Sequence, residues 1–185
     1  MEEKKIADVR IGEYLTEDVS ACVGERAHTY IDKFYKIHDH GYSFNWCAAL
    51  FTQVWFGYRK MWKAAAIVTG VNLILSIALK AFTTLFLPNT TYSSYKYILS
   101  GTLAITLLLF VVCGIAGDWF YCKHVTDILD ANGCKGRPAA EDSALEERLR
   151  NAGGVSLPGL FIVWGINFAL GKIVDWIAAG IMGPF

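Results

Sequence analysis

Two pairs of side chains near predicted helix ends have types that could bind a metal ion or carry out a reaction. His38 and His40 alternate in one segment, and Cys122 and His124 alternate in another. A metal site usually needs three or four ligands, and a catalytic cysteine needs a base beside it. Because neither pair has a third member nearby, we expect a solvated turn at the first and a membrane-interface position for the second. We therefore predict no metal, no cofactor and no catalytic residue, and we do not expect an enzyme.

A second group of polar side chains lies within otherwise apolar segments. In residues 64–87 the polar positions recur every three or four residues and so share one face of a helix. Lipid satisfies neither an amide nor an ammonium group, so this face should contact other helices. The intramembrane polar residues singled out in the whole chain are Asn72, Ser76, Lys80, Asn167, Lys172 and Asp175.

Two interpretations of these polar residues stay open. They form hydrogen bonds that hold helices together, or they line a polar route for a solute. Counted from the ends of their segments, Lys80 and Asp175 fall at similar depth, which predicts an ion pair between them. Lys172 can also pair with Asp175, because residues three apart are neighbours on a helix.

The elements that must hold these residues are helices. Residues 64–87, 98–117 and 155–183 are each long and apolar enough to cross a hydrocarbon core of about 30 Å. An external loop at 88–97 and a charged loop at 118–154, with a helix over 141–151, connect them. Residues 1–43 form a polar segment with a short amphipathic helix at 25–37, ended by Gly41. The fold class predicted is an all-α integral membrane protein with three transmembrane helices.

An aromatic segment at residues 44–63 precedes the first span. On a helix, five of its aromatic side chains fall on one face. Residues 44–58 would reach only about 22 Å, too short to cross a membrane. We therefore predict a helix that lies flat at the interface or re-enters the bilayer. The residues predicted at the membrane interface are Phe44, Trp46, Phe51, Trp55, Tyr58, Arg59, Lys60, Trp62, Trp119, Tyr121 and His124.

Composition argues against several classes of protein. The 185-residue chain is 54% hydrophobic and 18% charged with a formal net charge of +0, and without a basic block it predicts no nucleic-acid partner. Its five cysteines lack the paired spacing of a zinc or thioredoxin motif, so we expect no disulfide framework. The polar residues after Met1 do not resemble a signal peptide, so internal segments should direct insertion.

Charge counts predict the orientation in the membrane. Nine Lys and Arg residues precede residue 64, five lie in 117–154, and only Lys96 lies in 88–97. Cytoplasmic segments carry an excess of these residues. The N-terminus and the long loop should therefore be cytoplasmic, and the C-terminus external.

Several motifs carry a family resemblance. They are Tyr30–Ile37, Ser43–Trp46 continuing through Trp55–Trp62, Gly117–His124 and Gly153–Ser156. Together they resemble the bacterial membrane proteins grouped as the domain of unknown function 2628, over about residues 25–175. The chain departs from that pattern at Asp118, where asparagine is expected, and at 52–54, where the usual signal for a tight bend is missing. The resemblance implies a small multi-pass protein of the bacterial inner membrane and supplies no activity, substrate or catalytic residue.

The leading functional expectation is a non-enzymatic accessory, assembly or interaction subunit of the cell inner membrane, because anchoring and helix packing dominate the sequence. The alternative is a transport or channel subunit that works as an oligomer around a polar route. The expected partners are the lipid bilayer and either another protein or a second copy of the chain.

Overall fold

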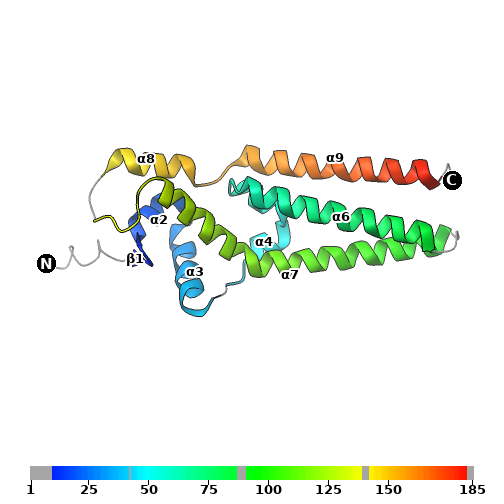
Figure 1. Cartoon of the computed structure of the whole chain (residues 1–185), viewed down its shortest axis with the longest axis horizontal. Coiled ribbons are helices and arrows are strands. Elements are labelled where there is room, and N and C mark those ends of the chain that lie inside the picture. The colour runs from blue at the N-terminus through cyan, green and yellow to red at the C-terminus, as the bar shows by residue number, and fades with distance from the viewer. Residues whose placement is uncertain (1–9, 42, 87–90, 139–141, 183–185) are drawn as a thin grey trace.

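The computed structural model describes residues 10–41, 43–86, 91–138 and 142–182. Figure 1 shows an elongated molecule in which three helices lie side by side along the longest axis. We call this part the bundle: α6 (Trp62–Phe86), α7 (Thr91–Ala131) and α9 (Leu157–Met182). The part at one end of the bundle is the head. It consists of β1 (Arg10–Ile11), β2 (Tyr14–Leu15), α2 (Thr16–Val23), α3 (Ala27–His40), α8 (Ser143–Ala152) and the last turns of α7.

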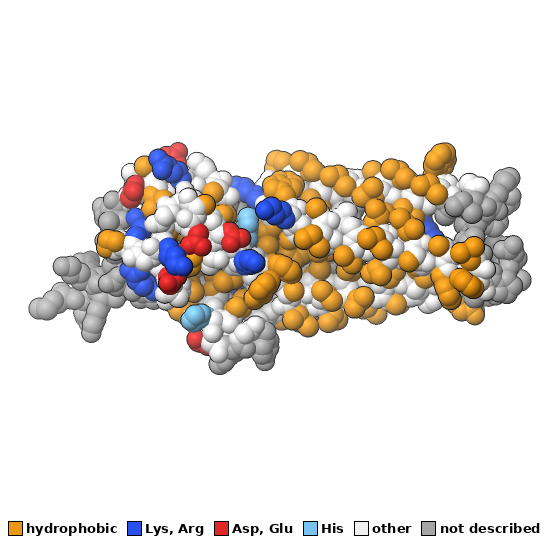
Figure 2. All heavy atoms as spheres, viewed as in Figure 1, with side chains coloured by type: hydrophobic (Ala, Val, Ile, Leu, Met, Phe, Trp, Pro, Cys, Tyr) orange, Lys and Arg blue, Asp and Glu red, His pale blue; other side chains and the backbone are white. Residues whose placement is uncertain are grey.

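The described residues contain three helices long and apolar enough to cross a membrane. Hydrophobic side chains cover the visible face of the bundle, whereas charged side chains gather on the head (Figure 2). Large apolar side chains are exposed on every bundle helix, among them Ile74 of α6, Leu107 of α7 and Trp176 of α9. Water-soluble proteins rarely expose an apolar surface of this extent. The helical architecture with three potential spans therefore agrees with the prediction.

Within the polar segment predicted over residues 1–43, only the helix at 25–37 was expected, but residues 10–23 also form secondary structure. Residues 10–15 form a two-stranded antiparallel hairpin in which Arg10 pairs with Leu15. Helix α2, which was not predicted, buries Val19, Cys22 and Val23 in the core of the head. These apolar residues form a narrow stripe among polar ones, so the composition of the stretch did not indicate a buried helix. The predicted amphipathic helix is α3, and Gly41, with a φ of 80°, ends it as expected.

The prediction that a loop begins at residue 118 is also wrong for residues 118–131, which are helical. Helix α7 continues without a break from the bundle into the head and ends at Ala131. Its buried residues Tyr121, Val125 and Leu129 recur every four positions, so they form one stripe against the head. The other faces of this part of α7 carry many charged residues, so the composition indicated a loop and not a helix. Helix α8, at Ser143–Ala152, matches the helix predicted there.

The predicted aromatic helix over 44–63 is two short helices, α4 (Trp46–Phe51) and α5 (Gln53–Tyr58). They are separated at Thr52, whose φ of 42° is uncommon for a β-branched residue. The two helices pack against different parts of the bundle, α4 on α7 and α5 on α9 and α6. A straight helix could not make both contacts, which explains the break.

Candidate functional site

A buried polar cluster joins the head to the bundle. Asp118 of α7 is fully buried, and its Oδ1 accepts a hydrogen bond of 2.6 Å from Asn45 Nδ2. Its Oδ2 pairs with Lys33 Nζ of α3 at 2.9 Å. Asn45 also caps α4, since its Oδ1 accepts a hydrogen bond of 2.9 Å from the backbone N–H of Ala48. One carboxylate therefore fixes the positions of α3, α4 and α7.

Arg59, which follows α5, is a buried cation surrounded by aromatic rings. Its side chain is 3% exposed, and its Nη1 donates a hydrogen bond of 3.1 Å to the hydroxyl of Tyr121. Its Cζ lies 4.5 Å from the ring centroid of Tyr30 and 4.8 Å from that of Tyr121. Within the described ranges no carboxylate forms an ion pair with Arg59, and its Nε has no hydrogen-bond partner.

A cavity of about 1260 Å³ lies where the head meets the bundle. Arg59, Tyr30 and Tyr58 line it together with the apolar side chains Trp55 and Leu160. Other lining residues come from α4 and α5, from α2 and α8 of the head, and from the segments on either side of α8. The cavity places a buried cation beside an apolar wall.

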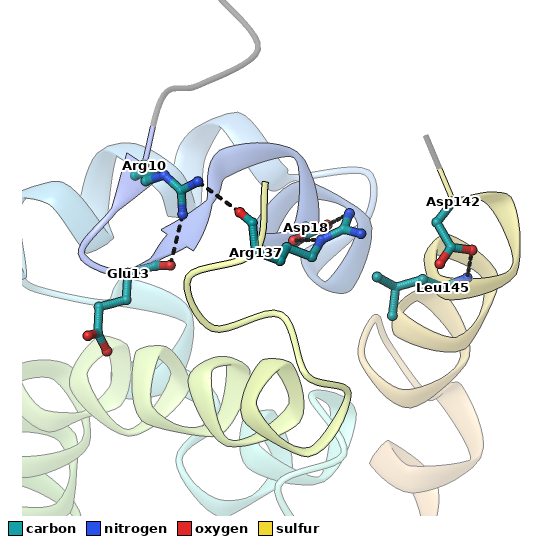
Figure 3. A network of polar contacts seen from close by, with 6 residues as sticks. All are labelled: Arg10, Glu13, Asp18, Arg137, Asp142 and Leu145. Carbon is teal, nitrogen blue, oxygen red and sulfur yellow. Dashed lines mark hydrogen bonds and ion pairs between the residues drawn. The ribbon is translucent and has the colours of Figure 1, made fainter. Parts of the chain in front are cut away.

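The head side of this cavity is held by the contacts that Figure 3 shows. Arg137 binds Asp18 of α2 through two hydrogen bonds, of 2.8 and 2.9 Å. Arg10 donates to the backbone oxygen of Arg137 at 2.8 Å, and Asp142 caps α8 by accepting from the backbone N–H of Leu145 at 3.0 Å. The hydrogen bond to Asp18 raises the pKa of Arg137 above its ordinary value. The negative charge of Asp18 is thus already paired with Arg137 within the head.

The residues predicted at the membrane interface separate into two groups. Phe44, Trp46, Phe51, Trp62 and Trp119 are exposed, as an interfacial position requires. Trp55, Arg59 and Tyr121 are buried inside the protein, so they do not form the exposed aromatic and basic surface that the prediction required. The rings of Trp55 and Tyr121, 5.8 Å apart, instead pack in the core at the junction. An aromatic stripe can face lipid or a protein core, and spacing alone does not distinguish them.

Three further interface residues are half-buried: Tyr58, Lys60 and His124. Lys60 Nζ donates a hydrogen bond of 2.9 Å to the backbone oxygen of Asn151, so it contacts protein rather than a headgroup. His124 Nε2 is buried and has no hydrogen-bond partner. Among the described residues, no three His, Cys, Asp or Glu side chains form a group that could hold a metal ion. All five cysteines are free thiols.

The polar residues predicted to lie within the membrane form two separate contacts between α6 and α9. Asn167 donates to Thr69 Oγ1 at 3.1 Å and accepts from Gln53 Nε2 at 3.1 Å. Nearer the far end of the bundle, Lys80 pairs with Asp175, which confirms the predicted ion pair.

The other intramembrane polar residues have different surroundings. Asn72 and Ser76 line a small cavity of about 300 Å³ between these two contacts. Lys172 lies over the ring of Phe168 at 5.7 Å, and no ion pair between Lys172 and Asp175 is present in the described residues.

The family described as "Protein of unknown function (DUF2628)" has a sequence model that matches residues 16–126, more than half of the chain. This match runs from the start of α2 to well within α7, and so it includes Lys33, Asn45, Arg59 and Asp118. It does not reach Gly153–Ser156, which the resemblance had included. No curated protein and no solved structure matches the chain.

Proposed function

The chain belongs to the DUF2628 family of proteins of unknown function, and from its arrangement we propose that it is a membrane-anchored, non-enzymatic accessory subunit. The observation that carries this proposal is the joint between head and bundle. Asp118 ties α3, α4 and α7 together through buried hydrogen bonds, so a polar head is fixed to an apolar three-helix anchor. Such an anchor holds a docking module at a defined height and orientation above a membrane.

We place the protein in the inner membrane of a bacterium, with three passes, a cytoplasmic head and an external C-terminus. The head and the last turns of α9 lie at opposite ends of the molecule (Figure 1), which an odd number of spans requires. The excess of Lys and Arg before residue 64 and in 117–154 supports the cytoplasmic assignment of the head.

A transport or channel subunit is the second candidate, supported by the cavity of about 300 Å³ beside Asn72 and Ser76. Three spans are few for a transporter that works alone, so this function needs an oligomer. The contacts of Asn167 and Lys80 with other side chains favour helix packing over an open route. A flux assay in proteoliposomes with Lys80→Met and Asp175→Asn variants separates the two functions.

The first test is purification of the tagged protein from its native host in nanodiscs, followed by mass spectrometry of the intact complex. A different protein bound in a fixed ratio supports the accessory function. A complex made only of copies of this chain overturns it and leads directly to the flux assay. A tagged membrane protein with the same number of spans, purified in parallel, identifies proteins that bind any such preparation.

A further inference from the structure

The cavity at the junction has two chemically different sides. The side formed by α4, α5 and α9 is lined by apolar and aromatic groups, among them Phe51, Val54, Trp55 and Leu160. Arg59 lies on the same side, with its guanidinium beside the rings of Tyr30 and Tyr121. A ligand that fits both features has an apolar part and an anionic group.

The guanidinium of Arg59 lacks the partner that a buried cation normally has. Removing an ion from water costs several times more than one interaction with an aromatic ring returns. One neutral hydrogen bond, to Tyr121, is its only hydrogen bond in the described residues. The Nε atom is both buried and unpaired. An anion bound against Arg59 would supply the missing counter-charge through the forked geometry that suits phosphate and carboxylate.

The acidic residues that also line the cavity do not take this role. Asp18 is bound by Arg137, and Glu146 is bound by Arg150 at 2.6 Å. Asp142 caps α8. The remaining two, Glu17 and Glu25, are exposed and form no ion pair with Arg59. The charge of Arg59 therefore stays uncompensated on the apolar side.

We propose that this cavity binds the phosphate of a membrane phospholipid, with Arg59 as the phosphate ligand and the apolar wall around Trp55 and Leu160 against its glycerol and upper acyl chains. Position favours a lipid as the source of the phosphate. The cavity lies between α2 and α8 of the head on one side and α5 and α9 on the other. Figure 2 shows charged side chains on the head beside the apolar surface of the bundle, a boundary that would lie at the depth of the phosphate groups in a bilayer. The choice of a phospholipid as the source of the phosphate rests on the proposed membrane placement. The binding of an anion by Arg59 does not.

The experiment is native mass spectrometry of the full-length protein, freed of lipid in detergent and then given one ligand at a time. The ligands are dioleoylphosphatidylglycerol, dioleoylglycerol, which lacks the phosphate, and inorganic phosphate. We expect the phospholipid to bind and the other two to bind far more weakly. Arg59→Gln should weaken phospholipid binding by about tenfold or more, because a charged hydrogen bond is lost.

A second variant keeps Arg59 and reduces the space beside it. Val155 lines the cavity and is exposed, so Val155→Trp adds bulk there without disturbing the core. It should also weaken phospholipid binding by about tenfold. The matched controls are Arg148→Gln, an exposed cation outside the cavity, and Leu157→Trp, an exposed residue near Val155. Both should bind as the unaltered protein does. If Arg59→Gln fails to fold, as judged by thermal melting, Val155→Trp decides the outcome.

Three results would overturn the proposal. Equal binding of dioleoylglycerol would show that the phosphate is not recognised, and unchanged binding by Val155→Trp would place the lipid elsewhere. Binding of inorganic phosphate without the phospholipid would reject a lipid ligand. Alkaline extraction of native membranes tests insertion separately, so a protein that resists extraction and binds no phospholipid refutes this proposal alone.

Discussion

Lys33 of α3 and Asp118 of α7 form an ion pair of 2.9 Å although 85 residues separate them in the sequence. The Asp118 side chain is fully buried, whereas that of Lys33 is 22% exposed. The same carboxylate accepts from Asn45, which caps α4. The pair therefore fixes the head against the helix that passes from the bundle into it.

Replacing Asp118 with alanine should loosen this joint. The amide of Asn45 would be left buried without its acceptor, which costs about 1–3 kcal/mol of unfolding free energy. Asp118→Asn keeps an acceptor for Asn45 but turns an amide NH2 toward Lys33, so it loses the ion pair alone and should cost less than Asp118→Ala. Asp127→Ala, at an exposed position on the same helix, is the control. Thermal melting of the three variants in one detergent tests the order, and equal losses for the two Asp118 variants would contradict it.

Close contact between α5 and α9 depends on two glycines. A Cβ on Gly159 would lie 2.5 Å from the backbone oxygen of Gly57, and one on Gly57 would lie 2.5 Å from Val163 Cγ2. Gly159→Ala should therefore force the helices apart and cost about 1–3 kcal/mol. Gly70→Ala is the control, because no heavy atom lies within 4 Å of the added Cβ. Equal melting temperatures for the two variants would show that α5 and α9 are not in contact.

The ion pair between Lys80 and Asp175 links α6 to α9 within the bundle. Reversal of either charge alone should lower the melting temperature, because it places like charges side by side in a poorly hydrated place. The double reversal should recover most of the loss, with a coupling energy of about 0.5–3 kcal/mol. The measurement is a double-mutant cycle in nanodiscs. Additive losses would mean that the two residues do not interact.

The stability of the folded head should depend on pH in the alkaline range because of Tyr14. Burial and a 2.7 Å hydrogen bond to Asp130 raise the pKa of Tyr14 to about 12 from its ordinary value of 10.0. A raised pKa favours the neutral hydroxyl in the folded protein. The stability it contributes is complete below pH 10 and is lost as the pH rises through 12. The difference in melting temperature between the native protein and Tyr14→Phe should shrink over that range, and a constant difference would contradict the assignment.

The rate at which Cys22 reacts with a thiol reagent tests the packing of α2 against the segment after α8. The thiol is fully buried, and burial raises its pKa to about 12. It should therefore react with maleimide much more slowly than the half-buried Cys47. A Cβ on Gly153 would lie 2.1 Å from the backbone oxygen of Cys22, so Gly153→Ala should speed its labelling. Peptide mass spectrometry resolves the two cysteines, and rapid labelling of Cys22 in the unaltered protein would refute the packing.

The bundle was predictable because its apolar segments are long and separated by polar ones. The pair of Lys80 and Asp175 was predictable too, because an ammonium and a carboxylate at equal depth in an apolar region need a partner. The head was not. Its helices are short, and their buried stripes, such as Tyr121, Val125 and Leu129, occur among many charged residues. Composition then indicates a loop where periodicity indicates a helix.

The candidate site was only partly predictable for a different reason. Arg59 was singled out as a residue at the interface, and spacing could not show that Tyr30 and Tyr121 enclose it. Tyr30 lies in the predicted amphipathic helix at 25–37, and Tyr121 lies in the loop predicted over 118–154. Their contact depends on α7 continuing into the head. Asp118 was noticed only as a departure from a family pattern, and its partner Lys33 carried no signal of its own.

Helix α7 passes through both parts of the molecule without interruption, and its 41 residues extend about 60 Å. A change in the direction of this helix therefore moves the head. A helix tilts when the bilayer around it changes thickness. A tilt of about 10° would displace the far end of a rod of this length by about 10 Å. Because Asp118 and Tyr121 fix the head to that rod, membrane thickness would set the position of the head relative to the membrane surface if α7 spans the bilayer as proposed.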